Sequence, residues 1–141
     1  FVLVRYAEIL LNYIEALNEY EPGNPDIVTY LNEIRNRAGV PDVTAGLGQE
    51  AMRTKIHHER RVELALESLR YFDTRSWKIA EQTYGGNFSV MHVDDDSPLT
   101  DLVFYQRTVL ERQVFLKNYY LFPIPQSEID RDAKLVQNPG W

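Results

Sequence analysis

Hydrophobic and polar positions in the first part of the chain follow a helical period. Apolar residues recur every three and four positions, which predicts helices over Phe1 to about Tyr20 and over residues 25–38. The predicted apolar stripes are Leu3, Tyr6, Ala7, Leu10, Ile14 and Leu17, then Ile27, Tyr30, Leu31, Ile34 and Ala38. Glu21-Pro22-Gly23 ends the first helix, and Asn24-Pro25-Asp26 caps and starts the second. Two helices joined by so short a connection pack antiparallel, like one tetratricopeptide unit.

A third, central helix is predicted from about Gln49 to Ser68 or beyond, because this stretch holds good helix formers and no Gly or Pro. Its apolar face would consist of Val62, Ala65, Leu66, Leu69 and Phe72. Leu64 and Tyr71 project from the far side, so other elements should cover this helix on two sides. Residues 71–81 either continue the helix or form a second segment after a bend.

A row of charged residues follows the same helical spacing beside the apolar face. Buried carboxylates need cationic partners, and arginines lie within this helix and at the end of the second one. The predicted structural ion-pair network comprises Arg35, Arg37, Glu59, Arg60, Glu63, Glu67 and Arg70. Acid–base catalysis by the glutamates is the alternative, although neighbouring arginines favour ionised, structural carboxylates.

Beyond the central helix the pattern changes. Tyr84-Gly85-Gly86-Asn87 breaks the helical period, and residues 88–93 and 102–115 have the β-branched and aromatic content of short strands. The tail should be extended up to Pro125 and turn into a short helix at Gln126.

The last residue, Trp141, is expected to dock on the helices. The predicted fold class is therefore mostly α: a tetratricopeptide-like helical pair and a central helix, followed by short β or irregular C-terminal segments. The length of 141 residues fits one domain, residues 1–141.

Charge and composition exclude several classes of function. The net charge of −6 argues against nucleic-acid binding, which needs a basic surface. No Cys is present, and no run of residues is apolar enough to span a membrane. His57-His58-Glu59 lacks a second His four residues away, and Asp94-Asp95-Asp96 lacks the spacing of a calcium loop, so no metal or cofactor is expected.

Four stretches occur in an order that is typical of one protein family. They are Arg5–Ala16; Leu31–Gly39; His58–Ala65 with Arg70–Asp73 and Arg75-x-Trp77; and Phe122–Ile129 with Gln137–Gly140. Together they resemble the C-terminal half of the SusD/RagB family. The family often has Gly where this chain has Ser68 and usually closes on Tyr where it has Trp141, and residues 82–112 match no family motif.

The resemblance implies a function. Family members are lipoproteins on the outer-membrane surface of Bacteroidetes, anchored through an N-terminal lipidated Cys. They bind glycans, or sometimes peptides, and deliver them to a SusC-like TonB-dependent transporter without enzymatic activity. The chain would then be the C-terminal portion of a longer protein. Its only link to the membrane would be a lipid anchor in the upstream portion.

Candidate carbohydrate-binding residues lie in the stretch that matches no family motif. Aromatic rings cover the apolar face of a sugar, and planar polar side chains bind its hydroxyls. The candidates are Tyr84, Asn87, Phe88, His92 and Tyr105. Ordinary loop packing is the alternative for these residues. The alternative for the whole protein is a tetratricopeptide-like scaffold that binds only other proteins.

Overall fold

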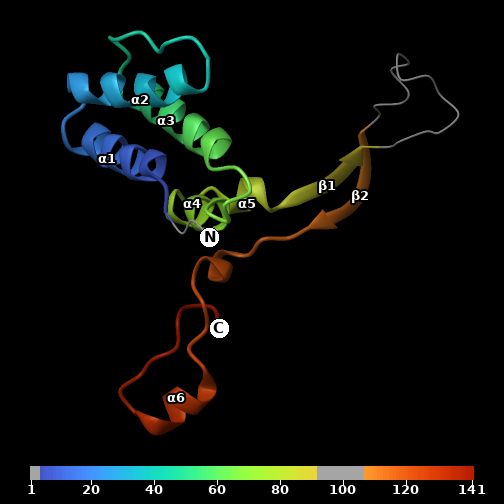
Figure 1. Cartoon of the computed structure of the whole chain (residues 1–141). Coiled ribbons are helices and arrows are strands. Elements are labelled where there is room, and N and C mark those ends of the chain that lie inside the picture. Colours follow the sequence, from blue (N-terminus) through green and yellow to red (C-terminus); the bar gives the residue numbers. More distant parts are fainter. Residues whose placement is uncertain (1–3, 92–106) are drawn as a thin grey trace, which may run out of the picture. The chain divides into compact units, whose positions relative to one another are not determined.

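The computed structural model of the chain describes residues 4–91 and 107–141, which fall into two units (Figure 1). The first unit runs from Phe1 to Arg70 and the second from Tyr71 to Trp141. The elements are α1 (Tyr6–Tyr20), α2 (Pro25–Arg37), α3 (Gln49–Glu63), α4 (Arg70–Ser76), α5 (Ala80–Thr83), β1 (Gly86–Met91), β2 (Arg107–Gln113), the 3-10 helix η2 (Lys117–Tyr120) and α6 (Gln126–Arg131). The predicted mostly helical fold class is confirmed.

The first unit is built around α1, which packs against both α2 and α3. Helices α1 and α2 run antiparallel, as Figure 1 shows. Their turn has the predicted chemistry: Gly23 adopts a left-handed φ of 86°, and the Asn24 side chain accepts a hydrogen bond of 3.0 Å from the Asp26 backbone N–H. The core consists of Leu10, Leu11, Ile14, Ile27, Leu31, Ile34, Val43, Met52, Ile56 and Leu64.

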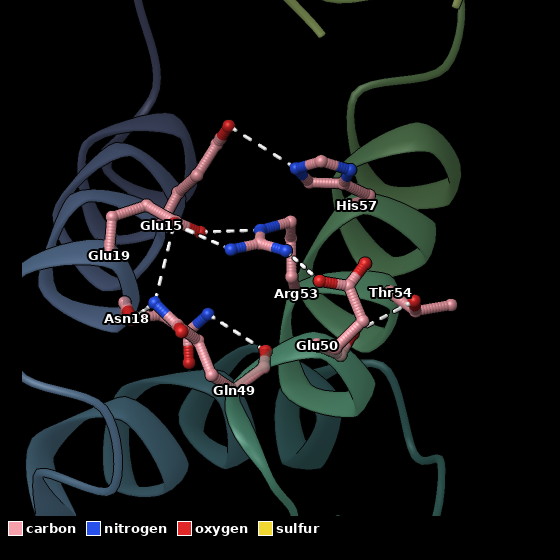
Figure 2. Close-up of polar contacts among 8 residues, drawn as sticks. All are labelled: Glu15, Asn18, Glu19, Gln49, Glu50, Arg53, Thr54 and His57. Carbon is pink, nitrogen blue, oxygen red and sulfur yellow. Dashed lines mark hydrogen bonds and ion pairs between the residues drawn. The ribbon is translucent and has the colours of Figure 1, made fainter.

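Polar residues join α1 to α3 along one side of this core (Figure 2). Arg53 donates two hydrogen bonds to the carboxylate of Glu19, at 2.6 and 2.7 Å, and also pairs with Glu50. The Asn18 amide donates to the Gln49 carbonyl at 3.1 Å, and the Gln49 amide donates back to the Asn18 carbonyl at 3.0 Å. This reciprocal pair fixes the first turn of α3 against the last turns of α1.

The central helix is shorter than predicted, because α3 ends at Glu63 rather than at Ser68 or beyond. The chain turns immediately afterwards, and Leu66 and Ser68 adopt left-handed φ values of 67° and 65°. Only Gly takes this conformation without steric cost, so Leu66 and Ser68 are strained at this turn. The bend forms here with Ser in that position.

The early end of α3 overturns part of the predicted apolar face. Val62, Leu66 and Phe72 are exposed, whereas Leu64, predicted on the far side, is buried in the core. Only Leu69 of the predicted face packs on that core. The predicted helix runs through residues 64–69, which are not helical, so the predicted face is correct for Leu69 alone.

The two earlier stripes are largely correct, with errors at their ends. Tyr6 and Ala38 are exposed, because Tyr6 is the first residue of α1 and Ala38 lies just past α2. Leu11 and Asn18 are buried although neither was placed in the stripe. Leu3 lies outside the described residues.

The sequence did not decide whether residues 71–81 continue the central helix or form a second segment after a bend. Residues after Ser68 form a separate segment, α4, and a break that includes Lys78, at a left-handed φ of 55°, separates α4 from α5. The predicted strands then form an antiparallel hairpin of β1 and β2, with a bulge between Phe88 and Ser89. The acidic stretch Asp94-Asp95-Asp96 lies outside the described residues.

The C-terminal end of the chain is held by amide side chains. Gln137 exchanges two 2.8 Å hydrogen bonds with the backbone of Ile124. The indole N–H of Trp141 donates to the carbonyls of Asn118 and Leu121, both at 3.1 Å, so the terminal ring docks on the 3-10 helix η2. Helix α6 starts at Gln126, as predicted.

Candidate aromatic cleft of the C-terminal unit

A cleft of about 520 Å³ lies within the second unit. It is lined by Tyr71, Arg75, Tyr84, Glu111, Arg112, Gln113, Val114, Phe115 and Tyr119. These residues come from α4, from the residue that follows α5, from the end of β2 and from the approach to η2. Four aromatic rings, two arginines, a carboxylate and an amide therefore meet in one space.

The aromatic wall is organised around Phe115. Its ring stacks on Tyr84 with centroids 6.3 Å apart and an interplanar angle of 26°. Tyr119 meets the same ring edge-on at 5.7 Å. Such geometries add to the apolar area that the rings bury, so the wall is a rigid, preformed surface.

Local sequence explains the position of Tyr84. It caps α5, with its backbone N–H bonded to the Ala80 carbonyl, and two glycines follow at once. A Cβ at Gly85 would lie 2.3 Å from the Glu81 carbonyl oxygen, so only Gly fits there. The tight turn directs the chain from α5 into β1 and leaves the Tyr84 ring at the cleft.

Arg75 lies on α4, four residues after Tyr71, and its guanidinium carbon is 5.3 Å from the Phe115 ring centroid and 5.8 Å from that of Tyr84. Its guanidinium carbon is 3.5 Å from the centroid of the Tyr71 ring, a close cation–π contact. Nη1 donates to the Tyr71 carbonyl at 3.2 Å, whereas the buried Nε has no acceptor among the described residues. The arginine is thus held in place by packing rather than by a counter-ion.

The structure places the predicted carbohydrate candidates in different surroundings. Tyr84 lines the cleft. Asn87 and Phe88 lie on β1 opposite Arg112 and Glu111, which line the cleft, but they do not line it themselves. His92 and Tyr105 lie outside the described residues.

Sequence reasoning missed Tyr71, Arg75, Phe115 and Tyr119. Two signals could have found them. Tyr71 and Arg75 are four residues apart, a spacing that puts side chains together on a helix such as α4. Aromatic residues are also concentrated between residues 115 and 122.

A larger cavity of about 860 Å³ lies elsewhere in the second unit, against η2 and the C-terminal turn. Tyr120 is the one aromatic residue that lines it, and its polar groups include the two lysines Lys78 and Lys117. It lacks the stacked rings of the first cavity, so we take the aromatic cleft as the candidate site.

The predicted ion-pair residues gather in the first unit. Glu59 pairs with Arg35, and Glu63 pairs with Arg37. Arg60 donates instead to the side-chain oxygen of Asn12. Arg70 is half-buried at the start of α4.

Arg5, which the sequence did not single out, completes this cluster. It donates to Glu63 at 2.8 Å and to Glu67 at 2.5 Å. The hydrogen bonds to Glu67 and Glu63 raise the pKa of Arg5, and those from Arg5 lower the pKa of Glu67. Carboxylates paired in this way stay ionised, which suits a structural role better than proton transfer.

Neither a metal site nor a membrane helix is found in the described part of the chain. No group of three or more His, Asp or Glu side chains within residues 4–91 and 107–141 is arranged to hold a metal ion. Within the same residues, every helix is too short or too polar to cross a bilayer.

Comparison with protein families decides the relationship. The model of the SusD family matches residues 1–141, the whole chain. The chain belongs to the SusD family. A SusD-like protein, P2, of Formosa agariphila is 30% identical over 149 residues, which cover 100% of this chain and 26% of that protein.

Solved structures of SusD relatives agree with this assignment. A SusD-like protein of Bacteroides fragilis has a TM-score of 0.82 and 32% identity, with 99% of this chain and 26% of that chain covered. A SusD-like carbohydrate-binding protein of the same species has a TM-score of 0.72 and 32% identity, with 90% of this chain and 27% of that one covered. The chain thus spans about a quarter of the length of these relatives.

Proposed function

We propose that the protein binds glycans at the cell surface and delivers oligosaccharides to a SusC-like TonB-dependent transporter of the outer membrane, without chemically changing them. Membership of the SusD family supports this function. One structural relative is itself described as carbohydrate-binding. Delivery, the transporter partner and the place at the outer membrane rest on the family relationship alone.

The observation that carries glycan binding is the stacked pair of Tyr84 and Phe115 in the cleft. The C–H face of a pyranose ring packs on aromatic rings, while its hydroxyls need planar hydrogen-bonding groups beside them. Gln113 and Glu111 provide such groups at the same cleft. The site requires no nucleophile and no metal, in keeping with binding rather than catalysis.

Titration calorimetry of the intact protein with a panel of oligosaccharides tests the proposal. Tyr84→Ala should lower the affinity for the glycan about tenfold, because the site loses one aromatic ring on which a sugar packs. Tyr20→Ala is the matched control, since Tyr20 is an 87% exposed tyrosine on α1, outside the cleft. Equal affinities for wild type and Tyr84→Ala would remove the cleft from the binding site.

Phe88→Ala measures how far the site extends. Phe88 lies on β1 opposite Glu111 and outside the lining of the cleft. A loss of affinity in Phe88→Ala as large as in Tyr84→Ala would show that the ligand reaches onto the hairpin. Unchanged affinity would confine the ligand to the cleft.

A second candidate, a scaffold that binds only proteins, is favoured by one surface. Tyr6, Ile9, Tyr13 and Tyr20 are exposed on α1 at the seven-residue spacing of a helix-packing stripe. The same titration separates the two functions. A pure protein scaffold binds no oligosaccharide of the panel.

A further inference from the structure

We infer that the ligand of the aromatic cleft is an acidic glycan, which carries a carboxylate or a sulfate ester. This inference rests on the proposed function, and it adds the charge of the glycan to it. Among the described residues, two arginines, Arg75 and Arg112, and one acidic residue, Glu111, line the cleft. The cleft therefore has an excess of one positive charge in a chain whose net charge is −6.

The donors of Arg75 are available for an anion. Among the described residues it has no carboxylate partner, Nη1 has one backbone acceptor, and the buried Nε has none. Protein atoms cover Nε, so the terminal Nη1 and Nη2 groups are the donors that an anionic ligand in the cleft would meet. The Tyr71 ring below the guanidinium holds its plane in a fixed orientation, which suits the planar fork that arginine offers to carboxylate or sulfate oxygens.

Arg112 provides a second cation at the same cleft. It lies near the end of β2 and is exposed, and its side chain has no hydrogen bond or ion pair with the residues that the structure describes. Arginines of the first unit behave differently: Arg5, Arg35 and Arg53 are each paired with glutamates. Unlike these three, the two arginines of the cleft have no carboxylate partner among the described residues.

Glu111 limits the charge that the site accepts. Its carboxylate accepts a hydrogen bond of 3.1 Å from the Gln113 amide and lines the same cleft. A ligand with one anionic group near Arg75 and Arg112 and neutral hydroxyls near Glu111 matches this arrangement. A neutral glycan leaves both arginines without a counter-charge.

The test compares three probes of equal length: a galacturonate oligomer, an O-sulfated galactose oligomer and a neutral galactose oligomer. Calorimetry of the intact protein at low salt should show at least one acidic oligomer binding about tenfold tighter than the neutral one. Which acidic oligomer binds tighter distinguishes carboxylate from sulfate. The preference should shrink as salt is raised, because ions screen exposed charges.

Two variants on one strand locate the effect. Arg112→Met should lower the ratio of acidic to neutral affinity about tenfold, whereas Arg107→Met, an exposed arginine of β2 outside the cleft, should leave the ratio unchanged. Thermal unfolding confirms that both variants fold, and Arg75→Met adds a second reading if it also folds.

The outcomes separate the two proposals. If neutral and acidic oligomers bind equally, glycan binding stands and the inference about charge is overturned. An equal loss in Arg107→Met and Arg112→Met would also overturn it, since the attraction would then come from the general surface. If no oligomer binds, the proposed function fails together with the inference.

Discussion

At the scale of single residues, Glu63 is the centre of the charge network in the first unit. Its carboxylate accepts hydrogen bonds from Arg5 and Arg37, and its backbone carbonyl accepts a further one from Arg5 at 2.9 Å. The side chain is 9% exposed. This carboxylate at the end of α3 joins the residue before α1 to the end of α2.

Glu63→Gln tests whether this carboxylate is structural. The variant should lose about 1–3 kcal/mol of unfolding free energy in urea titration, because two arginines lose their counter-charge. Its glycan affinity should stay within about twofold of wild type. Glu33→Gln, an exposed α2 residue without an ion pair among the described residues, is the control.

The opposite result would favour the catalytic alternative for Glu59, Glu63 and Glu67. In that case wild type would hydrolyse oligosaccharides, and Glu63→Gln would lose this activity while its stability stayed unchanged. No chemistry of that kind is expected from carboxylates that are already paired with arginines.

Residue-level prediction succeeded where the backbone is regular and failed where it bends. The stripe Ile27, Leu31, Ile34 is buried as its spacing requires. Leu64 and Leu66 were misplaced, because no local residue signals the left-handed turn at Leu66 and Ser68 in the way that a Gly would. The sequence contains the arginines and glutamates of the network but does not specify which pairs form, and so Arg5 was missed.

At the scale of elements, the side-by-side packing of α1 and α3 depends on polar contacts as well as on the core (Figure 2). Arg53 reaches from α3 to Glu19 on α1, and His57 lies 3.4 Å from Glu15. The hydrogen bonds from Arg53 lower the pKa of Glu19 below its usual value of 4.5. A carboxyl group whose pKa is lowered by folding stabilises the folded state only while it is ionised.

This linkage predicts how stability depends on pH. The contribution of Glu19 should be fully present above about pH 5 and be lost as the pH falls through the lowered pKa, below 4.5. The hydrogen bond from Arg5 also lowers the pKa of Glu67, so the contribution of Glu67 to stability should likewise be lost as the pH falls. Glu19→Gln should therefore be less stable than wild type at pH 7 and lose less stability on acidification to pH 3.

Thermal unfolding followed across this pH range provides the measurement. Glu33→Gln, whose side chain has no partner among the described residues, should follow the wild-type curve. Parallel curves for wild type and Glu19→Gln would contradict a role for this ion pair in joining α1 to α3.

Elements were predicted well where turn chemistry marks their ends. The α1–α2 connection, the start of β1 and the start of α6 all follow Gly, Pro or Asn signals. The aromatic cleft could not be predicted in the same way, because it joins α4 to residues near 115, and pairing across so many residues leaves no local signal. Of the three proposed carbohydrate residues that the structure describes, Tyr84 alone lies in its lining.

At the scale of the whole molecule, the chain is a SusD-family protein that spans about a quarter of the length of its relatives. Its first unit holds an apolar helical core with arginine–glutamate pairs beside it. Its second unit holds a cleft in which stacked rings lie beside arginines without counter-ions. That contrast is the reason to place ligand binding in the second unit and structural support in the first.

The most direct test of this account is hydrogen–deuterium exchange of the intact protein, measured by mass spectrometry with and without a saturating oligosaccharide. We expect slower exchange in peptides that cover residues 71–84 and 111–119, because these two stretches contain the residues that line the cleft. Exchange in α1 and α2 should not change. Slower exchange elsewhere, with none in these two stretches, would show that the glycan binds outside the cleft and would contradict the account.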